Sequence, residues 1–147
     1  MYILKAEHSF DSAHFLSGYD GKCSNIHGHR WNVYVEVQSE TLIIGGQLDG
    51  MVIDFGDLKD DVKSMVDSYD HALIVQEGTM RALTLNCIKQ DGFTVIEVDF
   101  RPTAENFAAF FFKLIKDKGY NVKTTTVYET PTNSASYEES EAHSSEV

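Results

Sequence analysis

The strongest constraint on the fold is a strict alternation of side chains over residues 27 to 38, "HGHRWNVYVEVQ". Counting by two places Trp31 and three valines on one side of an extended chain, with charged and polar residues on the other. A period of two predicts a strand that has one face in a core and one polar face. His27 and His29 continue the apolar side, so both imidazoles are expected to point the same way.

Alternation predicts further strands over residues 2 to 10, 94 to 100 and 122 to 129, and a short strand near 51 to 55 after a glycine-rich turn. His14 is expected in an irregular segment after the first of these strands. Several strands with few intervening helices indicate an α+β domain.

Two helices are predicted from apolar residues that recur at helical spacing. One covers about 56 to 68, with Asp54 or Asp57 able to cap its start, and the other begins after Thr103 and ends near Gly119. The segment 76 to 93 stays unassigned, although "MRALTLNCIKQ" within it is compatible with a helix. The expected architecture is a mostly antiparallel, four-stranded sheet with two helices on one face.

Composition limits the classes of function. Twelve basic and 23 acidic residues give a formal charge of -11, which argues against nonspecific binding of nucleic acid or anionic membranes. No apolar run is long enough to span a bilayer and the first residues do not resemble a signal peptide, so we expect a soluble, cytoplasmic protein with unpaired Cys23 and Cys87. Residues 1 to 137 are expected to form one domain, and the acidic segment 138 to 147 to be disordered.

His27 and His29 form a candidate metal site. Residues two apart in a strand share a face, with Cα atoms roughly 6.5 to 7 Å apart, so both rings can reach one ion. His14 is the favoured third ligand, because it follows a strand that could pair with the strand of the other two. Zinc held by three histidines keeps one position open for water or substrate. The alternative is that His-x-His marks two unrelated polar positions, and that Cys23 is a buried, inert thiol.

Several motifs in order resemble one enzyme family. "FDSAHFL", "CSNIHGH", "SYDHALI", "PTAEN" and "VYET" follow one another as in the 6-pyruvoyltetrahydropterin and 6-carboxytetrahydropterin synthases, proteins of the tunnelling fold. The three residues between Cys23 and His27 are similar to the spacing in bacterial 6-carboxytetrahydropterin synthases of queuosine biosynthesis. The resemblance implies a zinc-dependent carbon-carbon lyase that converts 7,8-dihydroneopterin triphosphate to 6-carboxytetrahydropterin, acetaldehyde and triphosphate.

Carried over residue by residue, the resemblance makes His14, His27 and His29 the zinc ligands. Cys23 becomes the general base, and a thiolate near a dication is expected to have a lowered pKa. Asp70 and His71 become a pair that relays or donates protons. Without the resemblance, these two adjacent residues would be read as the cap of a helix end.

The same resemblance places Glu129 on the ring nitrogens of the pterin, and Thr103 and Glu105 along its pocket. Each also has a purely structural interpretation. Glu129 could be an exposed strand carboxylate, Glu105 could complement a helix dipole, and Thr103 could be an N-cap alone.

The implied substrate is strongly anionic, so an acidic chain needs local positive charge near the site. Lys22, Arg30 and Arg101 are candidates, and their spacing does not select among them. The resemblance also implies a homo-oligomer, a hexamer of two trimers whose sheets close into β-barrels, with pockets between subunits that could supply basic residues from a neighbour. Two alternatives remain open: the pyruvoyl reaction, which eliminates triphosphate without cleaving the side chain, and a pterin-binding module without catalysis.

Overall fold

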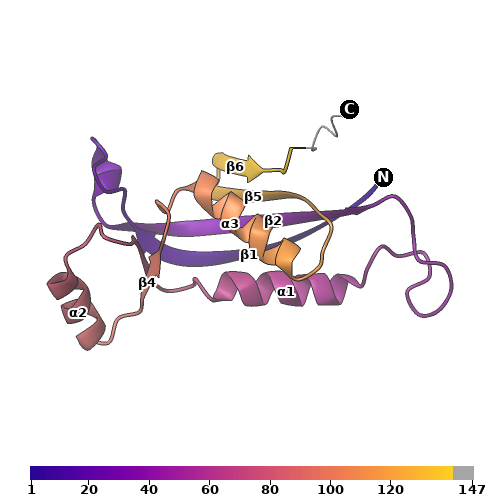
Figure 1. Cartoon of the computed structure of the whole chain (residues 1–147), viewed down its shortest axis with the longest axis horizontal. Helices are drawn as coiled ribbons and strands as arrows, with labels where there is room; N and C mark the ends of the chain where they lie inside the picture. Colours follow the sequence, from indigo (N-terminus) through magenta and orange to yellow (C-terminus); the bar gives the residue numbers. More distant parts are fainter. Residues whose placement is uncertain (141–147) are drawn as a thin grey trace, which may run out of the picture.

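The chain forms one six-stranded sheet covered by helices, seen in a computed structural model that describes residues 1–140 (Figure 1). The strand order is β4-β3-β1-β2-β5-β6. Its centre is a long antiparallel hairpin of β1 (Tyr2–His14) and β2 (His27–Ser39), in which His14 pairs directly with His27. On one side β5 (Val122–Thr130) and β6 (Asn133–Tyr137) continue the antiparallel order; on the other, β3 (Leu73–Gln76) and β4 (Val95–Val98) run parallel.

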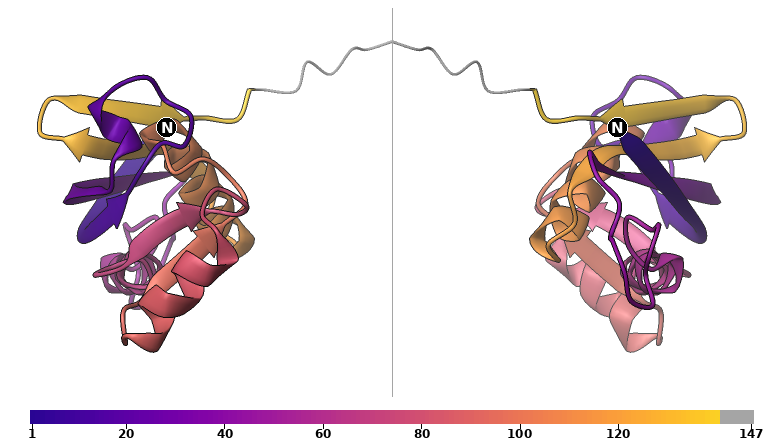
Figure 2. Two further views of the ribbon diagram at one scale, coloured as in Figure 1. Left: turned by 90° about the vertical axis from the view of Figure 1, so that its left-hand side faces the viewer. Right: turned by 90° about the vertical axis from the view of Figure 1, so that its right-hand side faces the viewer.

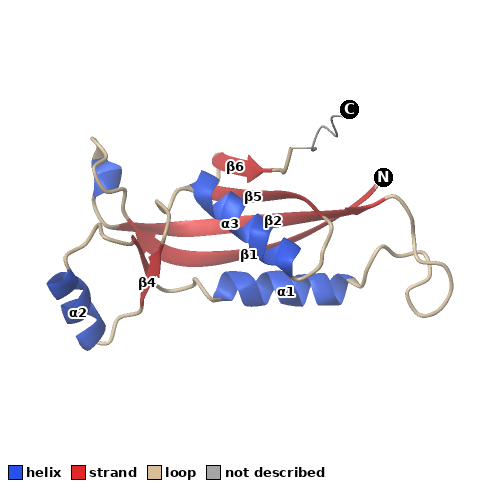
Figure 3. Cartoon of the chain, viewed as in Figure 1, coloured by secondary structure: helices blue, strands red, loops and turns tan. Residues whose placement is uncertain are grey.

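Two helices cover one face of this sheet, as predicted. The helices α1 (Phe55–Asp67) and α3 (Ala104–Asp117) lie on the same side of the hairpin when the molecule is viewed end-on (Figure 2). Each has the side-chain cap that its sequence allows: Asp54 accepts a hydrogen bond from the Gly56 N–H, and Thr103 from the Asn106 N–H. A third helix, α2 (Ala82–Gln90), lies apart from this layer at the end of the molecule that carries β4, and the short 3-10 helix η1 (Lys22–Ser24) projects separately at the same end (Figure 3).

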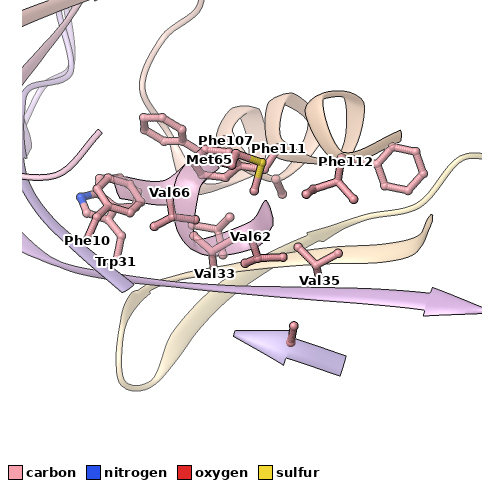
Figure 4. Packing of buried hydrophobic residues seen from close by; sticks show 14 of the residues in the cluster. Phe10, Trp31, Val33, Val35, Val62, Met65, Val66, Phe107, Phe111 and Phe112 are labelled. Atoms are coloured by element: carbon pink, nitrogen blue, oxygen red, sulfur yellow. The ribbon is translucent and has the colours of Figure 1, made fainter. Parts of the chain in front are cut away.

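The core fills the space between the hairpin and the two helices. The valines of β2 meet Val62, Met65 and Val66 of α1 and three phenylalanines of α3 there (Figure 4). Phe10 stacks on Trp31 with ring centroids 5.7 Å apart, and both are almost wholly buried. Burying aromatic rings of this size contributes much of the stability of a small domain. The apolar face predicted from the alternation in residues 27 to 38 is therefore the face that the helices cover.

Four expectations need correction. The sheet has six strands and not four, and it is mixed, because β3 pairs in parallel with β1 and β4. The short β3 was not predicted because it is buried on both faces and shows no alternation. Residues 1–140 contain three α-helices and not two. His14 ends β1 and is not in an irregular segment, since its backbone pairs with β2. Residues 51 to 54 lead into α1 without forming a strand.

Within residues 1–140, no helix combines the length and the apolar character needed to cross a membrane. At the start of the acidic segment, Glu138 accepts a hydrogen bond from the Thr124 hydroxyl and Glu139 pairs with Lys116. Residues 141 to 147 of the predicted tail lie outside the described residues.

Candidate metal centre

The hairpin brings the three predicted histidines together. His14 and His27 are opposite each other in the register, and His29 lies two residues further along β2 on the same face. One ligand atom from each of the three lies within 4.8 Å of the others. The ring centroid of His14 is 4.6 Å from that of His27 and 4.9 Å from that of His29. Two adjacent strands thus gather three side chains that are 13 and 15 residues apart in sequence.

Hydrogen bonds orient two of these rings. His14 Nδ1 donates to the carbonyl oxygen of Pro102 over 2.7 Å, and His27 Nδ1 donates to that of Asn25 over 2.7 Å. A carbonyl oxygen only accepts, so Nδ1 carries the proton and Nε2 keeps its lone pair when the ring is neutral. This is the arrangement by which metal-binding histidines are usually held.

Burial keeps the central ring uncharged. His14 is fully buried, and desolvation lowers its pKa to about 4, with the neighbouring His29 and His27 acting in the same direction. A neutral imidazole is the form that binds a metal ion. His14 therefore needs no deprotonation at neutral pH before it can act as a ligand.

The donor set fits zinc. His14 Nε2 and His29 Nε2 are 3.0 Å apart, close to the roughly 3.3 Å between two tetrahedral nitrogens that are each 2.0 to 2.1 Å from one ion. His29 Nδ1 is buried and has no hydrogen-bond partner in the described residues. Three imidazoles without a cysteine match catalytic zinc sites, in which a fourth position is kept for water or substrate.

Glu129 lies beside the three histidines and is not an isolated surface carboxylate. Its Oε1 is 3.5 Å from His14 Nε2 and 3.5 Å from His29 Nε2. The adjacent His29 imidazole is the main cause of the lowered pKa of Glu129, with His14 and His27 adding to it. The half-buried carboxylate is therefore ionised at neutral pH and adds a negative charge next to the metal-binding nitrogens.

Two other predicted residues, Thr103 and Glu105, lie at the start of α3, which is close to this group through Pro102. Thr103 is the N-cap, and Glu105 is exposed in the first turn. The Pro102 carbonyl that orients His14 is a functional element that sequence reasoning missed. No side-chain pattern marks a backbone acceptor, so only the fold reveals it.

Cys23 is a half-exposed, unpaired thiol in η1. Its backbone carbonyl accepts a hydrogen bond from the Leu16 N–H over 2.8 Å, which fixes this segment against the end of β1. Cys87 is also unpaired, as expected, and is exposed on α2. The thiol of Cys23 does not belong to the group formed by the three histidines.

Asp70 and His71 form a hydrogen-bonded pair in the turn after α1. His71 Nδ1 donates to Asp70 Oδ2 over 2.7 Å, and the other carboxylate oxygen accepts from the Asp11 N–H over 2.8 Å. That backbone N–H is the main cause of the lowered pKa of Asp70, and His71 adds to it. The His71 backbone is left-handed, with φ of 53°, and 80% of its side chain is exposed.

This pair lies away from the three histidines of its own chain. His71 lines an open cavity of about 410 Å³ together with Asp11, Ala13, Ile26 and Phe93. Ser12, which shares the face of His14, lines the same cavity, and the His71 N–H donates to the Asp11 carbonyl oxygen over 2.7 Å, so the pair lies along the edge of β1. Within the described residues, no polar contact joins Asp70 or His71 to the metal-binding group. The structure assembles the predicted metal ligands and Glu129, but leaves Asp70 and His71 apart from them.

Comparisons with known sequences all match the chain to tetrahydropterin synthases. The family model of 6-pyruvoyl tetrahydropterin synthase matches residues 3–140. The chain is 39% identical to 6-carboxy-5,6,7,8-tetrahydropterin synthase of Haemophilus influenzae, over 95% of this chain and all of that one, and 30% identical to the Synechocystis protein of the same name, over 93% of each.

Solved structures show the same fold. An uncharacterized protein of Wolinella succinogenes superposes with a TM-score of 0.75 at 20% identity, covering 95% of this chain and 98% of that one. The 6-pyruvoyl tetrahydropterin synthase of Caenorhabditis elegans superposes with a TM-score of 0.63 at 27% identity, with the same coverage.

Proposed function

Because this chain belongs to the 6-pyruvoyl tetrahydropterin synthase family, we propose that it is a zinc-dependent 6-carboxytetrahydropterin synthase. The reaction converts 7,8-dihydroneopterin triphosphate to 6-carboxytetrahydropterin, acetaldehyde and triphosphate, as a step of queuosine biosynthesis. One structural observation carries the proposal: three histidines of a single hairpin converge with Glu129 beside them. The names of the curated relatives and the three residues between Cys23 and His27 favour this branch of the family.

His14, His27 and His29 hold the zinc ion in this proposal. Zinc bound there would act as a Lewis acid that makes the hydroxyl groups of the substrate side chain more acidic. The chain contributes rigidity: the Pro102 carbonyl fixes the ring of His14, and the Asn25 carbonyl fixes that of His27. A hydrogen-bonded ligand shell of this kind keeps the ion in one geometry.

Cys23 acts as the general base that removes a proton from the substrate side chain. Its backbone carbonyl accepts a hydrogen bond from the Leu16 N–H, which holds this segment close to the end of β1 where His14 lies. The paired Asp70 and His71 return or relay protons, since a carboxylate on Nδ1 fixes the tautomer of the ring and leaves Nε2 free to exchange a proton.

A neighbouring copy of the chain supplies the Asp70–His71 pair to each site. The position of this pair beside Asp11, away from the three histidines, supports such an arrangement. In the described part of the sheet, β4 and β6 are the outer strands and each has one unpaired edge. Assembly into trimers that close as β-barrels, and of two trimers into a hexamer, would pair these edges, which are otherwise prone to aggregation.

Glu129 binds the pterin ring by accepting hydrogen bonds from a ring N–H and the exocyclic amine. Its ionised state supports this role, because a carboxylate is a strong acceptor of paired N–H groups. Thr103 and Glu105 line the same pocket from the start of α3.

The second candidate is the 6-pyruvoyltetrahydropterin synthase reaction, favoured by the likeness to the Caenorhabditis elegans enzyme. Mass spectrometry of the products of zinc-loaded protein and 7,8-dihydroneopterin triphosphate separates the two. A 6-carboxytetrahydropterin mass accompanied by acetaldehyde is the expected result. A pyruvoyl product would instead support the 6-pyruvoyltetrahydropterin synthase reaction, and unchanged substrate would contradict both reactions.

A further inference from the structure

Arg101 is linked to the metal-binding group through the following residue, and its own backbone is held in place. It precedes Pro102, whose carbonyl oxygen accepts the hydrogen bond from His14 Nδ1. The carbonyl oxygen of Arg101 itself accepts from the Thr103 N–H over 2.7 Å and from Asn106 Nδ2 over 2.9 Å. The side chain therefore starts from a fixed point one residue from an anchor of the candidate metal centre.

The guanidinium group of Arg101 makes one hydrogen bond within residues 1–140. Nη2 donates to the carbonyl oxygen of Ser17 over 3.0 Å, and the group lies 5.9 Å from the ring centroid of Tyr19. Nε is buried and has no hydrogen-bond partner in the part of the chain that the structure describes. A buried donor of a charged group without an acceptor is costly, so this position favours a ligand that can accept from it.

The charge of Arg101 is also unpaired among residues 1–140. Seven of the twelve lysines and arginines of the chain lie within 4.0 Å of an Asp or Glu oxygen, and Arg101 is not one of them. Arg30, another candidate for binding the anion, donates from Nε and Nη2 to both carboxylate oxygens of Asp11. Lys22 is an exposed residue of η1. Of the three candidates, Arg101 combines a free charge, a buried donor and a position one residue from Pro102, whose carbonyl orients His14.

We infer that Arg101 binds the oligophosphate end of the substrate, an inference that rests on the proposed function. The Nε–H and an N–H of Nη2 lie on one edge of the guanidinium plane, a spacing that matches two oxygens of a phosphate group. A chain of net charge -11 repels a polyanion, so one uncompensated arginine beside the site has a large effect on affinity. Arg101 thus distinguishes phosphorylated from unphosphorylated pterins.

A purely structural role makes a different prediction. Arg101 contacts Ser17 and Tyr19, and Leu16 of the same segment is hydrogen-bonded to Cys23. If the arginine only held this segment, its loss would weaken binding of every pterin by a similar factor. If it binds phosphate, only the phosphorylated ligand is affected.

The test is a pair of fluorescence titrations of zinc-loaded protein, one with neopterin and one with neopterin triphosphate. We expect Arg101→Gln to weaken binding of neopterin triphosphate on the order of 10- to 100-fold, the loss of a charge-assisted hydrogen bond, and to leave neopterin binding unchanged. Arg101→Lys should recover part of the loss, and the matched control Arg81→Gln, at an exposed arginine, should bind both ligands as the unmodified protein does. Zinc content is measured for each variant.

Either of two results would overturn the inference: equal loss of affinity for both ligands in Arg101→Gln, or no loss for the triphosphate. Turnover of 7,8-dihydroneopterin triphosphate by the unmodified protein is assayed separately. If turnover is absent while Arg101→Gln still removes the preference for the triphosphate, the proposed function fails and the inference about Arg101 stands.

Discussion

Replacing Ser12 by alanine should destabilise the turn that carries Asp70 and His71. The buried Ser12 hydroxyl donates to the carbonyl oxygen of Tyr69 and accepts from the Ala72 N–H over 3.2 Å. One oxygen atom on β1 thus binds the backbone on both sides of the pair. The same turn holds His71 in a left-handed conformation, which is unfavourable for a residue with a Cβ atom.

The size of the effect follows from the two hydrogen bonds. Removing one partner of a buried hydrogen bond costs about 1 to 3 kcal/mol, and here a carbonyl oxygen and an N–H group lose a shared partner. We expect the free energy of unfolding of Ser12→Ala to fall by about 2 kcal/mol. For a chain of this size, that change lowers Tm by roughly 4 to 8 °C.

Thermal unfolding at one fixed protomer concentration measures this difference, since assembly would make Tm depend on concentration. Ser9→Ala is the matched control, because Ser9 lies on the alternate face of the same strand, opposite Asn32. Turnover of Ser12→Ala should also fall, through the misplaced Asp70–His71 pair, while its zinc content stays the same. If both alanine variants unfold at the same temperature, the account of the Ser12 hydroxyl is wrong.

Three further predictions concern single side chains. Cys23→Ala should lose 10²- to 10⁴-fold in kcat, as expected for the loss of a general base, while retaining zinc. The control variant Cys87→Ala should keep full activity. A Cys23→Ala protein with normal turnover would refute the proposed base. Because hydrogen bonds lower the pKa of Asp70, its carboxylate stabilises the fold above about pH 4 and the contribution is lost on further acidification. In urea unfolding, the free energy of unfolding should therefore fall less between pH 7 and pH 3 for Asp70→Asn than for the unmodified protein. An equal fall in both proteins would contradict this. Thr103→Ala should cost about 1 kcal/mol in urea unfolding through the lost cap of α3, whereas Thr103→Ser should be near neutral; equal stabilities would argue against the cap.

Much of the fold could be predicted because its central strands have one buried and one polar face. The alternation around Trp31 predicted both the strand and the shared direction of His27 and His29. Helices α1 and α3 were also predicted, since their apolar stripes and the caps Asp54 and Thr103 are local features. The missing strands have physical reasons: β3 is buried on both faces and does not alternate, and β6, "NSASY", is a short outer strand of small polar residues.

The candidate site was predictable in part for a similar reason. Two of the metal ligands share one strand, so their spacing alone suggested a site. The position of His14 depends on the register of β1 against β2, which sequence reasoning anticipated only as a possible pairing. The Pro102 carbonyl and the Ser12 hydroxyl were missed, because their roles arise from contacts between segments 57 to 88 residues apart.

Zinc reconstitution of metal-stripped protein, with product formation from 7,8-dihydroneopterin triphosphate followed at each step, tests directly whether the three histidines hold a catalytic metal ion. If they do, activity is absent without zinc, rises in proportion to added zinc and saturates at one ion per chain, and His29→Ala neither retains zinc nor recovers activity. Full activity in the metal-stripped protein, or normal zinc content in His29→Ala, would contradict the central claim that the three histidines hold a catalytic metal ion.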